Sequence, residues 1–120
     1  MLKTTTIGSY PKPDYLNLPD WFKGEKGTDS EYPTAGWIEA VSAMGEDFEK
    51  IIIRASQEII QDQIDCGIDV VTDGEVRREN YIHYHCRFLK GIDFNKLTKK
   101  TARTGNYDCY LPTICLLYTS

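Results

Sequence analysis

The chain has 120 residues, of which 41% are hydrophobic and 27% are charged, and this ordinary balance argues against disorder along its whole length. The formal net charge is −4 and the single basic cluster, Lys96–Arg103, is short, so we expect no nucleic-acid partner. The sequence shows neither a secretory signal nor an 18-residue apolar run. We therefore expect a cytoplasmic protein without membrane association, whose four cysteines are free thiols.

The first predicted element is a short strand at Lys3–Ile7. Its β-branched residues are followed at once by Gly8-Ser9 and then by two prolines, a pattern typical of a strand that ends in a turn. Residues 10–36 are rich in Pro, Gly, Asp and aromatic residues and lack a regular period, so they predict a long loop with at most a helical turn near residues 15–22. Loops of this length inside a domain are uncommon and often functional.

An amphipathic helix is predicted over Glu46–Cys66, because apolar residues recur there at three- and four-residue steps. The predicted apolar face comprises Phe48, Ile51, Ile52, Ala55, Ile59 and Ile64. Gly67 should end this helix, and Ile68–Thr72 predicts a short buried strand that leads into the loop Asp73-Gly74-Glu75. Strand, helix and strand in this order indicate a parallel pair with a right-handed crossover.

Beyond that pair we expect a short helix over Arg77–Cys86, an irregular hairpin formed by Phe88–Phe94 and Thr98–Arg103, and the entry to a third strand at Cys109–Ile114. The predicted fold class is α/β, with the first two to three units of a (β/α)₈ TIM barrel. A complete barrel of this kind needs about 250 residues. Either the pattern is therefore an incomplete barrel, or a smaller fold uses the same opening.

The last six residues, 115–120, read CLLYTS, which is also one translation of a transposase adapter used in library preparation. We therefore expect residues 1–114 to be the native barrel segment and residues 115–120 to be a non-native tail. A natural apolar strand is the alternative. An isolated segment of this kind should fold poorly, because its parallel strands would leave unpaired edges exposed.

Two polar clusters follow the predicted strands, at the end where parallel α/β folds bind ligands. In Ile7-Gly8-Ser9, the glycine lets a ligand approach the backbone and the serine offers a hydroxyl and an N–H, although such a pair is also an ordinary turn. In Asp73-Gly74-Glu75, with Asn80 behind it, the carboxylates could bind an amino group or a cation. The alternative is a solvated loop whose acids pair with Arg77 and Arg78.

The segment His83–Cys86 contains two histidines and a cysteine, which are good zinc ligands. Their spacing does not place all three on one face of a helix or a strand, and no second cluster completes a tetrahedron. We therefore predict a packed or surface histidine pair and no metal site. Walker, GxGxxG, GxSxG and HExxH motifs are absent from the sequence, so nucleotide-dependent and serine-hydrolase functions have no support.

Three segments together resemble the cobalamin-independent methionine synthase family. They are TTTIGSYPKP (Thr4–Pro13), CGIDVVTDGEVRRENYIHYH (Cys66–His85) and YLPTI (Tyr110–Ile114), and their order and separations also agree. The resemblance implies the N-terminal part of the family's catalytic barrel. It also implies the reaction, in which a zinc-bound homocysteine thiolate takes a methyl group from a methyltetrahydrofolate-type donor to form methionine.

The resemblance also implies roles for individual residues. The turn Ile7, Gly8 and Ser9 would hold the carboxylate of the amino-acid substrate, and Glu75 would contact its amino group. Asp73, Asn80 and Cys109 are possible secondary contacts. Cys109 matches the cysteine of an Arg-Cys pair that touches folate in the family, and Asp108 stands in place of that arginine.

The family's zinc ligands lie further along its barrel, so we expect none within residues 1–114, and we expect this fragment alone to be inactive. Three alternatives remain at this stage. One is a barrel enzyme like uroporphyrinogen decarboxylase, another is a non-catalytic fragment that binds a small amino acid, and the third is a truncated product without function.

Overall fold

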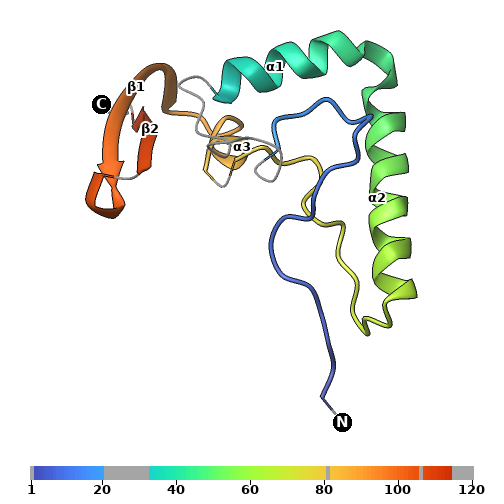
Figure 1. Cartoon of the computed structure of the whole chain (residues 1–120). Helices are drawn as coiled ribbons and strands as arrows, with labels where there is room; N and C mark the ends of the chain where they lie inside the picture. The colour runs from blue at the N-terminus through green and yellow to red at the C-terminus, as the bar shows by residue number, and fades with distance from the viewer. Residues whose placement is uncertain (1, 21–32, 81, 106, 115–120) are drawn as a thin grey trace.

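The computed structural model describes residues 2–20, 33–80, 82–105 and 107–114. In chain order its elements are α1 (Pro33–Met44), η1 (Gly45–Asp47), α2 (Phe48–Asp65), α3 (His83–Cys86), β1 (Ile92–Ala102), η2 (Arg103–Gly105) and β2 (Tyr107–Ile114). Figure 1 shows α2 along one side, the hairpin of β1 and β2 on the opposite side, and α1 running across the top. None of the described helices is both long enough and apolar enough to cross a membrane.

The long amphipathic helix predicted around residues 46–66 is confirmed as α2, preceded by the single turn η1. Ile52, Ala55 and Ile59 lie on its buried face as expected. Ile64 is different, because its side chain is 52% exposed, and the next buried position after Ile59 is a polar one, Gln63. The helix ends at Asp65, and Gly67 follows the C-cap Cys66 as the predicted terminating glycine, with a φ of +76°.

The helix α1 was missed, since the loop predicted for residues 10–36 runs past its start at Pro33. Proline fits the first turn of a helix, where the missing N–H has no intrahelical partner. Trp37, Ala40, Val41 and Met44 pack against the core from α1, and their spacing is helical. The stripe is short and contains Gly36, which weakens the helical pattern in the sequence.

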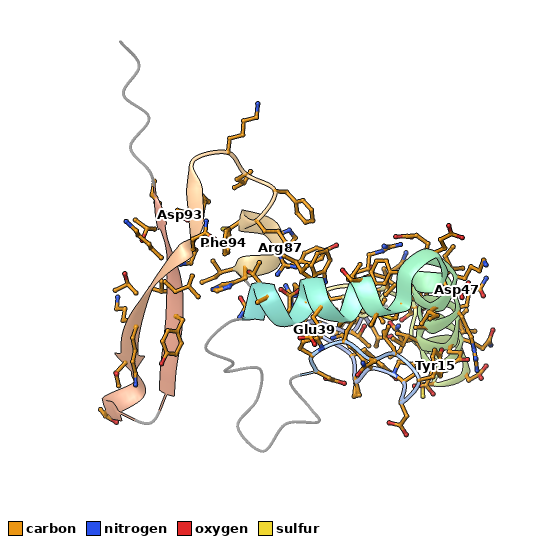
Figure 2. The ribbon with its side chains drawn as sticks, turned by 90° about the horizontal axis from the view of Figure 1, so that it is seen from above. Tyr15, Glu39, Asp47, Arg87, Asp93 and Phe94 are labelled. Carbon is orange, nitrogen blue, oxygen red and sulfur yellow. The ribbon has the colours of Figure 1, made fainter. Side chains whose placement is uncertain are left out.

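The core joins α2 to two segments without regular structure. Leu16 and Leu18 are buried from the N-terminal loop, and Val76 is buried from the turn after the second extended segment. Burying a leucine side chain contributes about 1.5–3 kcal/mol, so these leucines hold the loop against the helix without a backbone ladder. Tyr15, labelled in Figure 2, adds a contact from the same loop, because Arg54 of α2 lies 4.1 Å from its ring centroid.

The two predicted strands at Lys3–Ile7 and Ile68–Thr72 are extended segments that form one isolated parallel bridge, between Thr5 and Val70, instead of a continuous ladder. The predicted parallel direction is therefore confirmed. The burial predicted for Ile68–Thr72 is wrong, because Val70 is 50% exposed and none of the five residues is buried. Among the described residues, the only multi-residue sheet is the antiparallel pair β1 and β2, so further barrel units are not seen in this part of the chain.

The hairpin was assigned the wrong partners. The predicted partners were Phe88–Phe94 and Thr98–Arg103, but residues 92–94 of the first and residues 98–102 of the second lie on the single strand β1. The segment Cys109–Ile114 belongs to β2 and pairs back with β1, with Lys100 opposite Cys109. The chain reverses at Thr104 and Gly105, whose φ values of +56° and +94° suit a tight turn. The helix predicted over Arg77–Cys86 is shorter than expected, since α3 starts only at His83.

Candidate functional site

The two polar turns predicted from the sequence lie next to each other, because the extended segments that lead into them run in parallel. Val70 N–H donates to the carbonyl of Thr4 over 3.0 Å, and the Thr5 hydroxyl donates to the carbonyl of Val70 over 2.8 Å. Asp69 accepts from both the N–H and the hydroxyl of Thr4, which keeps the pKa of its carboxyl below the ordinary value. Both segments therefore end at the same edge.

The side chain of Gln63, on α2, holds the ends of both extended segments through hydrogen bonds to Thr6 and Thr72. Its amide oxygen accepts from the Thr6 hydroxyl at 2.8 Å and from Thr72 N–H at 3.0 Å. Its amide nitrogen donates to the carbonyl of Thr72 at 2.8 Å and to that of Ile59 at 3.0 Å. Gln63 is only 1% exposed, so these bonds satisfy a buried polar group that would otherwise be costly.

The turns touch each other through their backbones. Tyr10 N–H donates to the carbonyl of Gly74 over 2.9 Å. Gly74 has a φ of +63°, and Glu75 follows with a φ of +54°, a left-handed conformation that is uncommon for a residue with a side chain. Such backbone strain persists only where the surrounding contacts hold it, and it often marks functional sites.

Ser9, Glu75 and Arg78 form a connected polar triad at this junction. The Ser9 hydroxyl donates to Glu75 Oε2 over 2.9 Å, and Arg78 Nη2 donates to the Ser9 Oγ over 3.2 Å. The same Arg78 nitrogen forms an ion pair with Glu75 Oε2. The Arg78 side chain is 14% exposed and that of Glu75 is 34% exposed, so the carboxylate remains accessible while the guanidinium is mostly enclosed.

The predicted neighbours of the triad support the turn. Asp73 is exposed, and its carboxylate accepts the N–H of Glu75 over 3.0 Å. Asn80 Oδ1 accepts the N–H groups of Ile82 and His83 at 2.9 and 3.0 Å, which begins α3. Asp73 therefore holds the backbone of Glu75 itself, whereas Asn80 holds the start of α3 further along the chain.

Two other predicted site residues lie apart from the triad. The side chain of Ile7 is 98% exposed, so this residue can contribute to the first turn only through its backbone N–H and carbonyl groups. Cys109 lies in β2, and its side chain is outside the part of the chain that the structure describes.

The two arginines behind the turn have different partners. Arg78 pairs with Glu75, as the solvated-loop alternative supposed, whereas Arg77 forms a two-bonded ion pair with Glu49 of α2 at 2.8 and 2.6 Å. That pair lowers the pKa of Glu49 and raises the pKa of Arg77. Arg77 thus ties the turn to α2, and only Arg78 faces the junction of the two turns.

Sequence reasoning missed two supporting residues. Gln63 could have been identified from the sequence. It lies four residues after Ile59 on the buried face of α2, where an apolar residue is expected. The role of Lys12 could not have been identified, since this residue lies in a stretch without periodicity. It is 4% exposed, its Nζ donates to the carbonyl of Arg78 over 2.9 Å, and its N–H donates to buried Asp20 over 2.8 Å.

The histidine segment has a packing role. His83 is buried, its Nε2 donates to the carbonyl of Tyr110 over 2.7 Å, and its ring meets Phe94 edge-on. Burial lowers the pKa of His83, and the bond to Tyr110 opposes that shift in part. Across the described ranges, no group of three or more His, Cys, Asp or Glu residues is placed to hold a metal ion, so the described residues do not fit a zinc site.

A second buried ion pair lies beside α1. Arg87 pairs with Glu79, and the two side chains are 7% and 0% exposed. The guanidinium lies 4.2 Å from the ring centroid of Trp37, and Figure 2 shows Arg87 alongside α1. Burial lowers the pKa of Arg87 to about 10. Glu79 Oε2 and Arg87 Nε and Nη1 have no hydrogen-bond partner, so this pair is only partly satisfied.

Comparison with known proteins gives one consistent family. The model of the family described as "Cobalamin-independent synthase, Catalytic domain" matches residues 2–115. A methionine synthase of Saccharolobus islandicus (strain Y.N.15.51 / Yellowstone #2) is 32% identical over 94 residues, which cover 78% of this chain and 24% of that protein. A methionine synthase of Sulfolobus acidocaldarius is also 32% identical over 94 residues, covering 78% of this chain and 23% of that protein.

A solved structure agrees with the sequence relatives. It is a B12-independent methionine synthase from Shewanella sp. W3-18-1 in complex with selenomethionine. It superposes with a TM-score of 0.65 at 30% identity, over 95% of this chain and 29% of that one. The chain therefore spans about a quarter of the length of the relatives that it matches.

Proposed function

The chain belongs to the catalytic-domain family of cobalamin-independent synthases, and we propose on this basis that it supplies the amino-acid-binding turns of a methyltransferase. The complete enzyme would transfer a methyl group from a methyltetrahydrofolate-type donor to the thiol of homocysteine and release methionine. One observation carries the proposal. Ser9 and Glu75, 66 positions apart, meet over 2.9 Å at the edge where both extended segments end.

The chemistry of the two turns suits the polar end of an amino acid. Glu75 is a partly exposed carboxylate and would pair with the substrate ammonium. The backbone of Ile7, Gly8 and Ser9 would face the substrate carboxylate, since N–H groups are suitable donors for it. Asp73 and Asn80 would act indirectly, Asp73 by holding the backbone N–H of Glu75 and Asn80 by holding the start of α3. Cys109 remains a proposed secondary contact.

In the complete protein we expect this segment to form the opening units of a TIM barrel, with residues 115–120 not part of the native chain, and we expect a cytoplasmic location. Zinc, when bound, would lower the pKa of the substrate thiol. Its ligands would have to come from other parts of the complete protein, because the described residues do not provide them. Nothing argued for Ser9 or Glu75 depends on the metal.

Two other functions, a decarboxylase and an amino-acid-binding fragment, are less well supported. The relatives named above are methionine synthases, which does not favour a decarboxylase. A fragment that only binds an amino acid would use the same Ser9–Glu75 junction, so only an assay of methyl transfer can distinguish it from the proposed enzyme.

The test uses a complete protein that carries this sequence and measures methyl transfer to homocysteine. Glu75→Gln should raise the KM for homocysteine on the order of ten- to hundredfold, because a hydrogen-bonded charge pair is lost. Glu46→Gln is the matched control, since Glu46 is an exposed residue of η1 and belongs to neither turn, and the KM of this variant should not change. An unchanged KM in Glu75→Gln would reject the site, and binding of homocysteine without any methyl transfer would reject the enzyme.

A further inference from the structure

Arg78 is the member of the triad to which no role has yet been assigned. Its Nη2 reaches both Ser9 Oγ, at 3.2 Å, and the Glu75 carboxylate. Its backbone is held on both sides, because its N–H donates to the carbonyl of Glu75 over 2.9 Å and its carbonyl accepts from Lys12 Nζ over 2.9 Å. The guanidinium therefore projects from a fixed turn, and a fixed side chain loses little entropy when it binds a ligand.

The charges at the junction favour a dipolar ligand. With Glu75 alone, the site would attract any primary amine. With Arg78 beside it, the site holds one negative and one positive charge within a single triad. A free α-amino acid carries the complementary pair of charges on two groups attached to the same carbon. Its entry would replace the single Glu75–Arg78 pair by two pairs, with no uncompensated charge left in a partly buried site.

In this structure the Ser9 hydroxyl is hydrogen-bonded to both charged members of the triad. Its proton is directed to Glu75 Oε2, and its oxygen accepts from Arg78. For a substrate carboxylate, the Arg78 guanidinium is a stronger partner than a hydroxyl, because its planar N–H groups match a carboxylate in two parallel bonds, and it would act together with the backbone N–H groups of the first turn. The hydroxyl then serves to align Glu75 and Arg78.

We propose that Arg78 is a specificity-determining residue, which pairs with the substrate carboxylate and so selects a zwitterionic α-amino acid over a simple amine. The inference rests on the proposed function, because it places the amino acid at the Ser9–Glu75 junction. It adds the residue that distinguishes an amino acid from the amine obtained by removing its carboxylate.

The experiment measures equilibrium binding by calorimetry to a complete protein that carries this sequence. The two probes are methionine and 3-(methylthio)propylamine, which lacks only the carboxylate. In Arg78→Gln, methionine should bind on the order of ten- to hundredfold more weakly, while the amine should bind as well as before or more tightly. Arg78→Lys should recover part of the methionine affinity, because it restores the charge without the fork of donors.

The outcomes separate this inference from the proposed function. Equal weakening of both probes in Arg78→Gln would mean that the arginine only orients Glu75, and would overturn the inference. Unchanged methionine binding in that variant would also overturn it. In both cases the proposed function stands if Glu75→Gln weakens both probes. Failure of the unmodified protein to bind methionine would overturn the two together, and a thermal melt of each variant shows that it is folded.

Discussion

Gly74 leaves no room for a side chain at the candidate site, and substitution there tests how the two turns are held together. A Cβ added to Gly74 would lie 2.5 Å from the Cβ of Tyr10 and 2.9 Å from Cγ2 of Ile59. Neither atom can rotate away freely, since one is attached directly to the backbone and the other belongs to the buried core. In Gly74→Ala the turns must therefore separate, and the alanine must also adopt a φ of +63°.

The magnitude follows from two contributions. A left-handed conformation costs an ordinary residue roughly 1–2 kcal/mol, and overpacking of a core costs about 1–3 kcal/mol. Gly74→Ala should thus lower the free energy of unfolding by about 2–5 kcal/mol. Gly67→Ala is the matched control, because its φ is +76° but its added Cβ meets no atom within 4 Å. The control should lose only the conformational part, roughly 1–2 kcal/mol.

Denaturant unfolding of the complete protein measures both losses, and methionine binding measures the effect on the site. Since Ser9 precedes Tyr10 and Glu75 follows Gly74, separating the turns should weaken methionine binding in Gly74→Ala and leave it intact in Gly67→Ala. Equal loss of stability in the two variants would refute the packing argument. Unchanged binding in Gly74→Ala would refute the link from this contact to the site.

Three further predictions concern buried polar groups. Glu79→Gln leaves Arg87 buried without a counter-charge and should lower the free energy of unfolding by about 3–5 kcal/mol. If this loss were no larger than that of an exposed Glu→Gln control, the pair would not be buried as described. Gln63→Leu leaves the N–H and the carbonyl of Thr72 without their partners. It should lower the free energy of unfolding by about 1–3 kcal/mol for each of these groups and speed hydrogen exchange of the Thr72 amide. Unchanged exchange would show that Gln63 does not hold this backbone. Burial lowers the pKa of His83, so its contribution to stability is complete above the unfolded value of about 6.5 and is lost as pH falls through the lower folded pKa. Between pH 7 and 5, stability should therefore fall less steeply in His83→Gln than in the unmodified protein, and parallel slopes would contradict this assignment.

The sequence predicts the parts of this fold that depend on local periodicity. The spacing of Ile52, Ala55 and Ile59 predicts α2, and Gly67 marks its end. The parallel direction of the two extended segments follows from their order around that helix, and the bridge from Thr5 confirms it.

Features set by distant contacts could not be predicted in this way. The hairpin partners depend on where the chain reverses, and the reversal at Thr104 uses a left-handed residue that the sequence does not mark. The helix α1 has a short apolar stripe that packs on the core through Trp37, and its strength comes from that packing more than from local propensity.

In the candidate site, too, some features could be predicted from the sequence and others depend on distant contacts. The sequence predicts that Ser9 and Glu75 approach each other, because parallel segments end at one edge. It does not decide between the two arginines, because that choice depends on the backbone reversal at Glu75. With a φ of +54° at that residue, the chain turns so that Arg78 faces back to Glu75 and Arg77 faces Glu49.

The positions of both turns depend on one side chain of α2. Gln63 bonds to Thr6 and to Thr72, each of which precedes a turn by only a few residues. Displacing α2 would therefore move both turns, whereas the hairpin reaches the turn segment through His83, which bonds to Tyr110 of β2 well beyond Glu75. The separation of Ser9 and Glu75 should accordingly respond to substitutions on the inner face of α2 and be nearly insensitive to those in β1. Substrate binding and the stability of the α2 core are for this reason expected to change together.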